Sequence, residues 1–453
     1  MILIPGIVAG LFSRFAALQL YLWFALFRPQ EWLWIDVSQL RLSLLIGLLL
    51  VIPSVLTGVL PDVTHPLSAG AAMFLLTALG AQLNAYRPDI GWEWLDYITR
   101  VVLVSTLALK LISTRQKFVV TLAVIAGSFG FHSAKAGVAF LIGGGVQFAV
   151  GVAGAFPDNE GYALGTAMIM PLLVAVGQNM DRRWLRWGFF AAVPLSALTV
   201  VGTFSRGGFL ALAAAALTMA LCQRRRLLAL GGLITACVVL LLVVPIPAGY
   251  FDRLQTIHTY EEVGDESALG RLHIWRVALD MVADRPFGIG LHNFVPTYDR
   301  YDFSNGQYGR GRAVHNSHLE VLAETGYLGA AIWCGLFAYA FVACFRIRAR
   351  ARDGGLEEEE RRFLRSAAAG LLASMAAFIV GGAFLAIALN DITWLTFSLV
   401  AALDRLSKQM VSRSTMDAEA LAQLPEASMV TARPALRRLA HTLAPIVRCQ
   451  GLA

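Results

Sequence analysis

Long apolar stretches alternate with short polar connectors along the whole chain. About 20 consecutive apolar residues with few charges suffice for a transmembrane helix. Twelve apolar runs of roughly this kind occur, at 5–27, 41–60, 66–85, 97–112, 117–133, 160–178, 187–204, 207–222, 227–247, 319–345, 363–386 and 390–404. The pattern predicts an all-α polytopic membrane protein with about 12 transmembrane helices.

Composition supports this class. Of the 453 residues, 57% are hydrophobic and 15% are charged, whereas soluble proteins have about 45–50% apolar and about 25% charged residues. The first run lacks the basic start and small-residue cleavage site of a signal peptide, so we expect it to stay in the membrane. Arg14 lies within it, which leaves residues 1–13 either in the first span or in a separate interfacial or half-helix.

Arginine-rich connectors predict the orientation. They lie at 113–117, 181–186, 223–226 and 346–362, and the tail is also basic. Positive charge is retained on the cytoplasmic side, and an even number of runs separates each pair of these connectors. Both termini are therefore expected inside. The same rule accounts for the net charge of +7, so nucleic acid is not expected as a partner.

Four regions follow from this count. The longest polar stretch lies between spans 9 and 10 and contains a helical pattern over 267–286. A glycine-rich interruption before the sixth run favours amphipathic or re-entrant backbone. The predicted regions are 1–247 (spans 1–9, interrupted at 134–159), 248–318 (a large outer loop with helices), 319–404 (spans 10–12) and 405–453 (a basic cytoplasmic tail).

Histidines gather in the outer loop. It holds five of the eight in the chain, namely His258, His273, His292, His315 and His318. The loop also has seven arginines and no lysine, a set suited to bidentate phosphate recognition. Lysine is rare throughout the chain, however, so the histidines are the stronger sign of chemistry.

Arg206 stands in a short turn, "TFSRGG", between two apolar runs. A charged residue at the end of a span must face water, a partner or a ligand. Gly207 and Gly208 permit a tight turn and leave room for a ligand near the backbone. Both ligand binding and snorkelling to lipid headgroups fit this position.

The stretch "HNSHLEVLAETGYLG", residues 315–329, precedes the tenth span. Ser317 and Glu320 have the spacing of a capping box, which predicts a helix N-terminus at the membrane surface. Such an end favours anions. His315 would be held beside it, with a pKa range suited to proton transfer. A metal site of the form His-x-x-His is the alternative, although it needs further ligands.

Four segments resemble one family. "HNSHLEVLAETGYLG" resembles the His-Asn-x-x-Leu…Glu-x-Gly-x-x-Gly signature of the O-antigen ligase and polymerase superfamily. "TFSRGGFLALAAA" is similar to its Ser-Arg-Gly turn, and "FPDNEGYA" to its Asp-x-Asn-like turn before a span. "SALGRLHIWRVALDMVADRPFGIGLHNF" resembles its Gly-Arg…Trp…Pro-x-Gly-x-Gly loop. Together these segments cover about residues 150–345.

The resemblance implies a metal-independent, inverting glycosyltransferase of GT-C-like architecture in the bacterial inner membrane, with no cofactor. It would transfer a glycan from undecaprenyl pyrophosphate to the outer-core sugar of lipid A-core at the periplasmic face. His315 would be the general base, with His318 as its rival in the same signature. Arg206 and Arg271 would clamp the pyrophosphate. Lys135, Asn316, His318 and Glu324 would contact or support the substrate.

Three alternatives stay open at this point. Within the superfamily, the chain would otherwise be a glycan polymerase or a protein O-oligosaccharyltransferase. Outside enzymes, a lipid-linked glycan transporter is the main rival, but transporters place ionisable groups near the membrane midplane, where this chain has almost none. We expect a monomer or a weak oligomer whose partners are lipids and the two glycan substrates.

Overall fold

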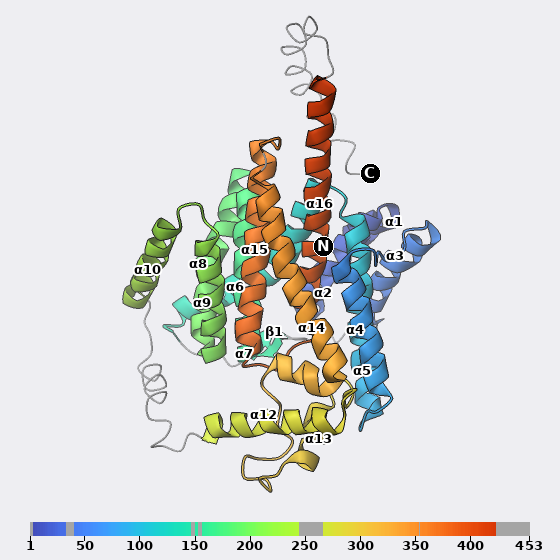
Figure 1. Cartoon of the computed structure of the whole chain (residues 1–453). Coiled ribbons are helices and arrows are strands. Elements are labelled where there is room, and N and C mark those ends of the chain that lie inside the picture. The colour runs from blue at the N-terminus through green and yellow to red at the C-terminus, as the bar shows by residue number, and fades with distance from the viewer. Residues whose placement is uncertain are drawn as a thin grey trace, which may run out of the picture.

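The chain forms a helical bundle with one short β-hairpin, and helices that lie across one end of it (Figure 1). The computed structural model describes residues 3–32, 40–145, 150–152, 156–243, 266–352 and 354–422. Five described helices are long and apolar enough to cross a membrane by length and composition. They are α6 (Arg115–Ile142), α7 (Asn159–Asn179), α8 (Arg183–Thr203), α14 (Ser317–Arg350) and α15 (Glu358–Gly382).

The remaining helices complete the pattern. They are α1 (Leu3–Phe12), α2 (Arg14–Phe27), η1 (Pro29–Trp32), α3 (Leu42–Leu56), α4 (Pro66–Gln82), α5 (Pro88–Leu111), α9 (Arg206–Leu221), α10 (Arg226–Val243), α12 (Glu266–Asp284), α13 (Phe294–Tyr301) and α16 (Asp391–Ala422). Each of the twelve predicted apolar runs overlaps a described helix, and the first overlaps two. Over the residues that the structure describes, this multi-pass membrane protein is helical apart from the hairpin of β1 (Val150–Val152) and β2 (Phe156–Asp158).

The first apolar run is broken into two helices. Ser13 ends α1 and caps α2, because its side chain accepts a hydrogen bond from the Ala16 N–H. The helices fold against one another, so that Gly6 of α1 faces Leu20. The Arg14 guanidinium bonds the Thr57 hydroxyl after α3. The alternative of a separate helix over residues 1–13 therefore describes the chain better than a single span over 5–27.

The centre of the bundle is built from α7, α9 and α15, with small residues at their crossings. A side chain on Gly208 of α9 would collide with Ala163 of α7, and one on Gly381 of α15 with Ala211 of α9. Within a membrane, the hydrophobic effect does not drive helices together, so they associate through close van der Waals packing. Small residues allow this packing because they let the helix backbones approach closely. This close packing brings the N-terminal ends of α7 and α9 together.

A charged cluster joins helices at the opposite end. Asp404 of α16 is 2% exposed and accepts a hydrogen bond of 2.6 Å from Arg350 of α14. Lys408 and His65 also contact its carboxylate, at 2.8 and 3.4 Å. A buried carboxylate requires such partners to compensate for its lost hydration. α14, α16 and the start of α4 are thereby fixed to each other.

The described part of the predicted outer loop, from residue 266 onward, has its own small core. The predicted helix at 267–286 is confirmed as α12, which lies across the bundle below α14 (Figure 1). Ile274 and Met281 of α12 pack with Phe294 and Tyr298 of α13. The side chain of Asn293 bonds both backbone groups of Arg87, at 2.7 and 3.2 Å. These bonds attach the loop to the start of α5.

Two helices extend past the boundaries of the predicted regions. α6 continues to Ile142, so the interruption expected from 134 begins as regular helix. α16 continues to Ala422, past the predicted end of the last span at 404. His258 and the last part of the tail, residues 423–453, lie outside the described residues.

Candidate functional site

His315 occupies the last turn before α14. Its backbone has φ of 47°, in the left-handed region. The preceding residue, Val314, is buried, and its carbonyl accepts a hydrogen bond of 3.2 Å from the Trp275 indole of α12. The next residue, Asn316, caps α14 by accepting from the N–H groups of His318 and Leu319, at 2.9 and 3.1 Å. His315 is thus held between two anchored neighbours.

The predicted capping box is wrong, because Asn316 and not Ser317 is the cap. The Ser317 hydroxyl donates instead to the Leu385 carbonyl at 2.6 Å, and it accepts from the Ile387 N–H at 3.1 Å. Glu320 accepts from the Ala388 N–H at 3.0 Å. Both side chains fasten the segment between α15 and α16 to α14.

Three charged side chains act on His315. Burial lowers the pKa of its imidazole, Arg271 and Arg312 lower it further, and Asp158 opposes them. A half-buried imidazole within electrostatic reach of two guanidinium groups stays neutral at pH 7. Glu160, at the start of α7, also lies within electrostatic reach of Arg271. The structure therefore places Arg271 within electrostatic reach of His315.

His318 has a different environment. Its Nδ1 accepts a hydrogen bond of 3.1 Å from the Trp333 indole N–H. Its Nε2 lies 3.1 Å from the Ile379 carbonyl, to which it can only donate. The imidazole is thereby fixed as the neutral Nε2–H tautomer with no lone pair free. A side chain in this state cannot accept a proton or bind a metal without losing one of these bonds.

Arg206 begins α9 at the same end of the bundle. Ser205 caps this helix by accepting from the Gly208 N–H at 3.0 Å. The Asn159 side chain, at the start of α7, donates to the Thr203 carbonyl at 2.9 Å. Gly207 faces Phe384, which adjoins the segment held by Ser317. These contacts connect the Arg206 turn to the starts of both α7 and α14.

Three helix N-termini thus meet at one end of the bundle: those of α7, α9 and α14. Their capping residues are Asp158, Ser205 and Asn316. Unpaired N–H groups and aligned peptide dipoles make each such end favourable for anions. α12, which carries Arg271, crosses below these ends (Figure 1). Arg271 and Arg312 add positive charge near His315, and Asp158 adds negative charge.

Two predicted residues have other contacts. The ammonium of Lys135 lies 4.2 Å from the centre of the Trp32 ring, a cation–π pair on the side of α6 near η1. Glu324 is buried, and its carboxylate accepts from the N–H groups of His292 and Phe294, at 2.7 and 3.2 Å. Glu324 thereby supports the loop from within α14.

Glycines from two of the family-like segments, residues 267–294 and 315–329, form one structural joint between α12 and α14. α14 is kinked at Gly326, with φ 72° and ψ −174°. The Tyr327 N–H bonds the Pro286 carbonyl at 3.0 Å, and the Gly290 N–H bonds the Glu324 carbonyl at 3.1 Å. Side chains at Gly288 or Gly326 would collide with this facing backbone. The joint positions α12 against α14 and therefore Arg271 against His315.

Asp158, Glu160 and Arg312 were not predicted as site residues. Asp158 and Glu160 lie in "PDNEG" directly before an apolar run, which is the pattern of a helix cap beside a span. Arg312 lies between glycine and alanine in a loop and carries no such signal. Within the described residues, no three His, Cys, Asp or Glu side chains gather as a metal site would require.

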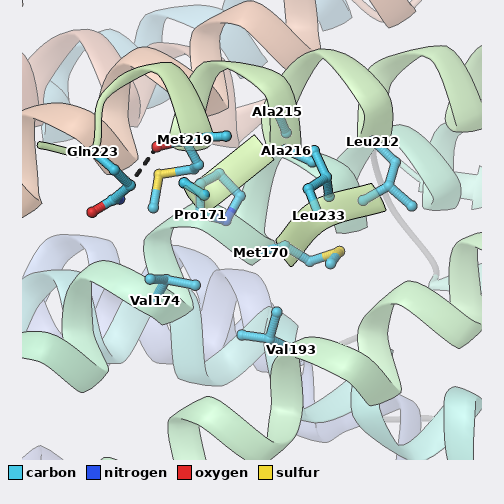
Figure 2. Close-up of a pocket in the computed structure, with 12 residues that line it drawn as sticks. Met170, Pro171, Val174, Val193, Leu212, Ala215, Ala216, Met219, Gln223 and Leu233 are labelled. Carbon is cyan, nitrogen blue, oxygen red and sulfur yellow. Dashed lines mark hydrogen bonds between the residues drawn. The ribbon is translucent and has the colours of Figure 1, made fainter. Parts of the chain in front are cut away.

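An apolar pocket of about 280 Å³ lies elsewhere, between α7, α8, α9 and α10 (Figure 2). Met170, Val193 and Leu233 line it, and Gln223 at its edge donates to the Met219 carbonyl at 3.2 Å. These residues include the last turn of α9, which is the end opposite Arg206. The pocket is therefore separate from the His315 site.

Comparison with known families identifies the region around the site. Residues 190–334 match a family model described as O-antigen ligase. This region is similar to the O-antigen ligase family. The match includes Arg206, Arg271 and His315, and it confirms the superfamily suggested by the four segments.

Members of the family are membrane glycosyltransferase-like enzymes that act on lipid-linked glycans. Residues 1–177 match a second family model, described as a family of unknown function. The comparison with curated proteins gave no match.

Proposed function

We propose that the protein is an O-antigen ligase that moves a glycan from undecaprenyl pyrophosphate to the outer-core sugar of lipid A-core. The observation that carries the proposal is a neutral, half-buried His315 beside Arg271 at the meeting point of three helix N-termini. The bacterial inner membrane, the periplasmic orientation of this end, the twelve-span arrangement and the GT-C-like architecture belong to the same proposal. They rest on the charge pattern and the family.

The proposed reaction needs little covalent chemistry from the protein. The acceptor hydroxyl oxygen attacks the anomeric carbon, and its proton passes to His315. The bond from that carbon to the phosphate oxygen breaks, and undecaprenyl pyrophosphate leaves with the electron pair. Attack opposite the leaving group inverts the anomeric centre. Arg206, Arg271 and the helix ends would stabilise the negative charge that develops on the leaving group.

His315 is the better candidate for the general base. Both nitrogens of His318 bond to the protein, as described above, whereas neutral His315 lies among cationic side chains. Asn316 and Glu324 hold backbone N–H groups, so we assign them support of the site and not substrate contact. Lys135 stays a weaker candidate for substrate contact because its described partner is Trp32.

The direct test uses purified protein in lipid with an undecaprenyl-pyrophosphate glycan and lipid A-core, with chelator and without nucleotide. A ligase shifts the acceptor upward on a gel by the mass of the glycan. Lengthening of the donor glycan alone would identify a polymerase. Transfer to a protein hydroxyl alone would identify an O-oligosaccharyltransferase, and movement of the donor between leaflets without transfer would identify a transporter.

Arg206→Lys is expected to lower donor turnover at least about tenfold. Lysine keeps the charge but loses the planar fork that binds two phosphate oxygens at once. The measurement is kcat/KM for the donor at fixed acceptor. Arg276→Lys is the matched control, because Arg276 pairs with Asp280 on an exposed face of α12. Equal turnover in Arg206→Lys and wild type would refute bidentate recognition at this position.

Arg312→Gln is expected to move the acidic limb of the pH–rate profile to higher pH. A base works only when deprotonated, so activity falls as the pH drops through the pKa of His315. Arg312 lowers that pKa, and its removal therefore raises it. The shift should be larger at low salt, because Arg312 is exposed and screened. Arg310→Gln serves as the control, and an unmoved limb in Arg312→Gln would contradict this coupling.

A further inference from the structure

Besides the apolar pocket of Figure 2, a cavity with polar walls lies between α2, α3, α5 and α16. No part of the proposed reaction uses it. Its volume is about 170 Å³, and its walls include Arg28, Gln30, Tyr97, Arg100 and Asp391. Pockets for drug-sized ligands measure roughly 300–1,000 Å³. This cavity therefore suits one small group, such as a single sugar ring.

Two acceptor groups line the cavity, the Asp391 carboxylate and the side-chain oxygen of Gln30. Asp391 is the first residue of α16, and its carboxylate accepts a hydrogen bond of 2.9 Å from the Tyr97 hydroxyl. The side-chain oxygen of Gln30 is buried and has no hydrogen-bond partner among the residues that the structure describes. A buried acceptor without a donor is unfavourable, so a ligand hydroxyl that entered the cavity would gain a hydrogen bond to this oxygen.

Charge distinguishes the classes of ligand. Arg28 already pairs with Glu31 at 3.5 Å. Arg100 pairs with Asp96 at 2.5 Å. An anion would therefore meet the Asp391 carboxylate without an unpaired cation to balance it, and a metal cation would meet two guanidinium groups. Neutral hydroxyl groups fit best, since each can donate to Asp391 or Gln30 and accept from an arginine.

The cavity is connected to the His315 site by one short segment. Between α15 and α16, Phe384 faces Gly207 beside Arg206, and Ile387 bonds Ser317 next to the site. Asp391, at the cavity, lies seven residues after Phe384 in the sequence. Seven residues span at most roughly 25 Å when fully extended, so a ligand of several sugars could reach from the cavity to the site.

We propose that this cavity binds one sugar of the acceptor glycan and holds it while another sugar of the same acceptor reaches His315. The role as an acceptor site rests on the proposed ligase function. Most of its walls come from residues 1–177, the region that matches a family of unknown function. Acceptor recognition would then be the task of that region.

The test measures binding directly, with the full chain in lipid nanodiscs and the lipid-free core oligosaccharide as the probe. In Gln30→Leu, we expect affinity for the oligosaccharide to fall at least about fivefold, because a hydrogen bond to the ligand is lost. Thermal stability should stay equal or rise, since an unpaired buried oxygen is removed. A merely structural Gln30 would leave affinity unchanged. Asp391→Asn keeps the size of the side chain and should weaken binding in the same way.

Gln19→Leu is the matched control. The Gln19 side-chain oxygen is also buried and unpartnered, but its amide bonds Thr121 on α6, outside the cavity. It should leave oligosaccharide affinity unchanged. Wild-type affinity in Gln30→Leu would overturn the proposal. So would wild-type protein that binds no oligosaccharide, or competition for the cavity by inorganic phosphate or sodium.

Steady-state kinetics separate this proposal from the ligase assignment. Gln30→Leu should raise KM for the acceptor while KM for the donor and kcat stay near wild type. If Gln30→Leu transfers the glycan with an unchanged KM for the acceptor, the sugar-binding role of the cavity is refuted and the ligase assignment stands. Oligosaccharide binding that depends on Gln30, without any transfer by wild type, refutes the ligase and leaves the cavity as a sugar site.

Discussion

Replacing His315 with glycine is expected to lower glycan transfer about 10²- to 10⁴-fold while the protein stays folded. The loss is expected because the proposed general base is removed. Among the described residues, both ring nitrogens of His318 are bonded to the protein, whereas those of His315 have no hydrogen bond to it. Glycine is a favourable replacement here, because the backbone of His315 has φ of 47° and glycine adopts this conformation without strain. The measurement is the gel-shift assay with lipid A-core at saturating donor.

Two further readouts separate catalysis from structure. Added imidazole should restore part of the transfer by His315→Gly, since it supplies the missing base in the space left by the side chain. His318→Gln should behave differently: it breaks the bonds to Trp333 and Ile379, so we expect a lower unfolding temperature. Full activity in His315→Gly would disprove the base assignment and make His318 the next candidate.

Gly326→Ala is expected to destabilise the protein by about 3–5 kcal/mol, or to prevent the outer loop from docking. Residues other than glycine almost never adopt φ 72° with ψ −174°, and the new methyl group would collide with the Pro286 carbonyl and with Phe287. Loss of docking also moves Arg271 away from His315. Unfolding temperature in nanodiscs and proteolysis of the outer loop measure the two effects.

Gly335→Ala is the control on the same helix, because a side chain there meets nothing within 4 Å. It should be neutral or slightly stabilising, since alanine favours helix more than glycine does. If Gly326→Ala keeps wild-type stability and protease resistance, the kink of α14 is not the joint that positions α12.

Much of the helical order was predictable from local sequence. Twelve apolar runs fall on helices, and the periodic segment at 267–286 forms α12. Local composition determines these features because each segment gains free energy by leaving water on its own. The break at Ser13 was one of two predicted alternatives, and the sequence could not choose between them, because the choice depends on contacts with α3 and α2.

The cap of α14 shows where local rules stop. Asn316 and Ser317 are adjacent, and both residue types cap helices well. The choice was made by a distant partner: the Ser317 hydroxyl bonds Leu385 and Ile387, which leaves Asn316 to cap. The signature Glu324 and the glycines likewise hold the fold together through contacts with the outer loop, which no spacing rule predicts.

By itself, the sequence determined the membrane class, most helix positions and the family, because hydrophobic periodicity and short motifs are local properties. The tertiary structure decided which charges surround His315 and why His318 is engaged elsewhere. It also brought Asp391 to a cavity made by residues 1–177. These features depend on pairs of groups from different segments, up to 294 residues apart for Tyr97 and Asp391, whose electrostatic and hydrogen-bond energies exist only once the helices have packed.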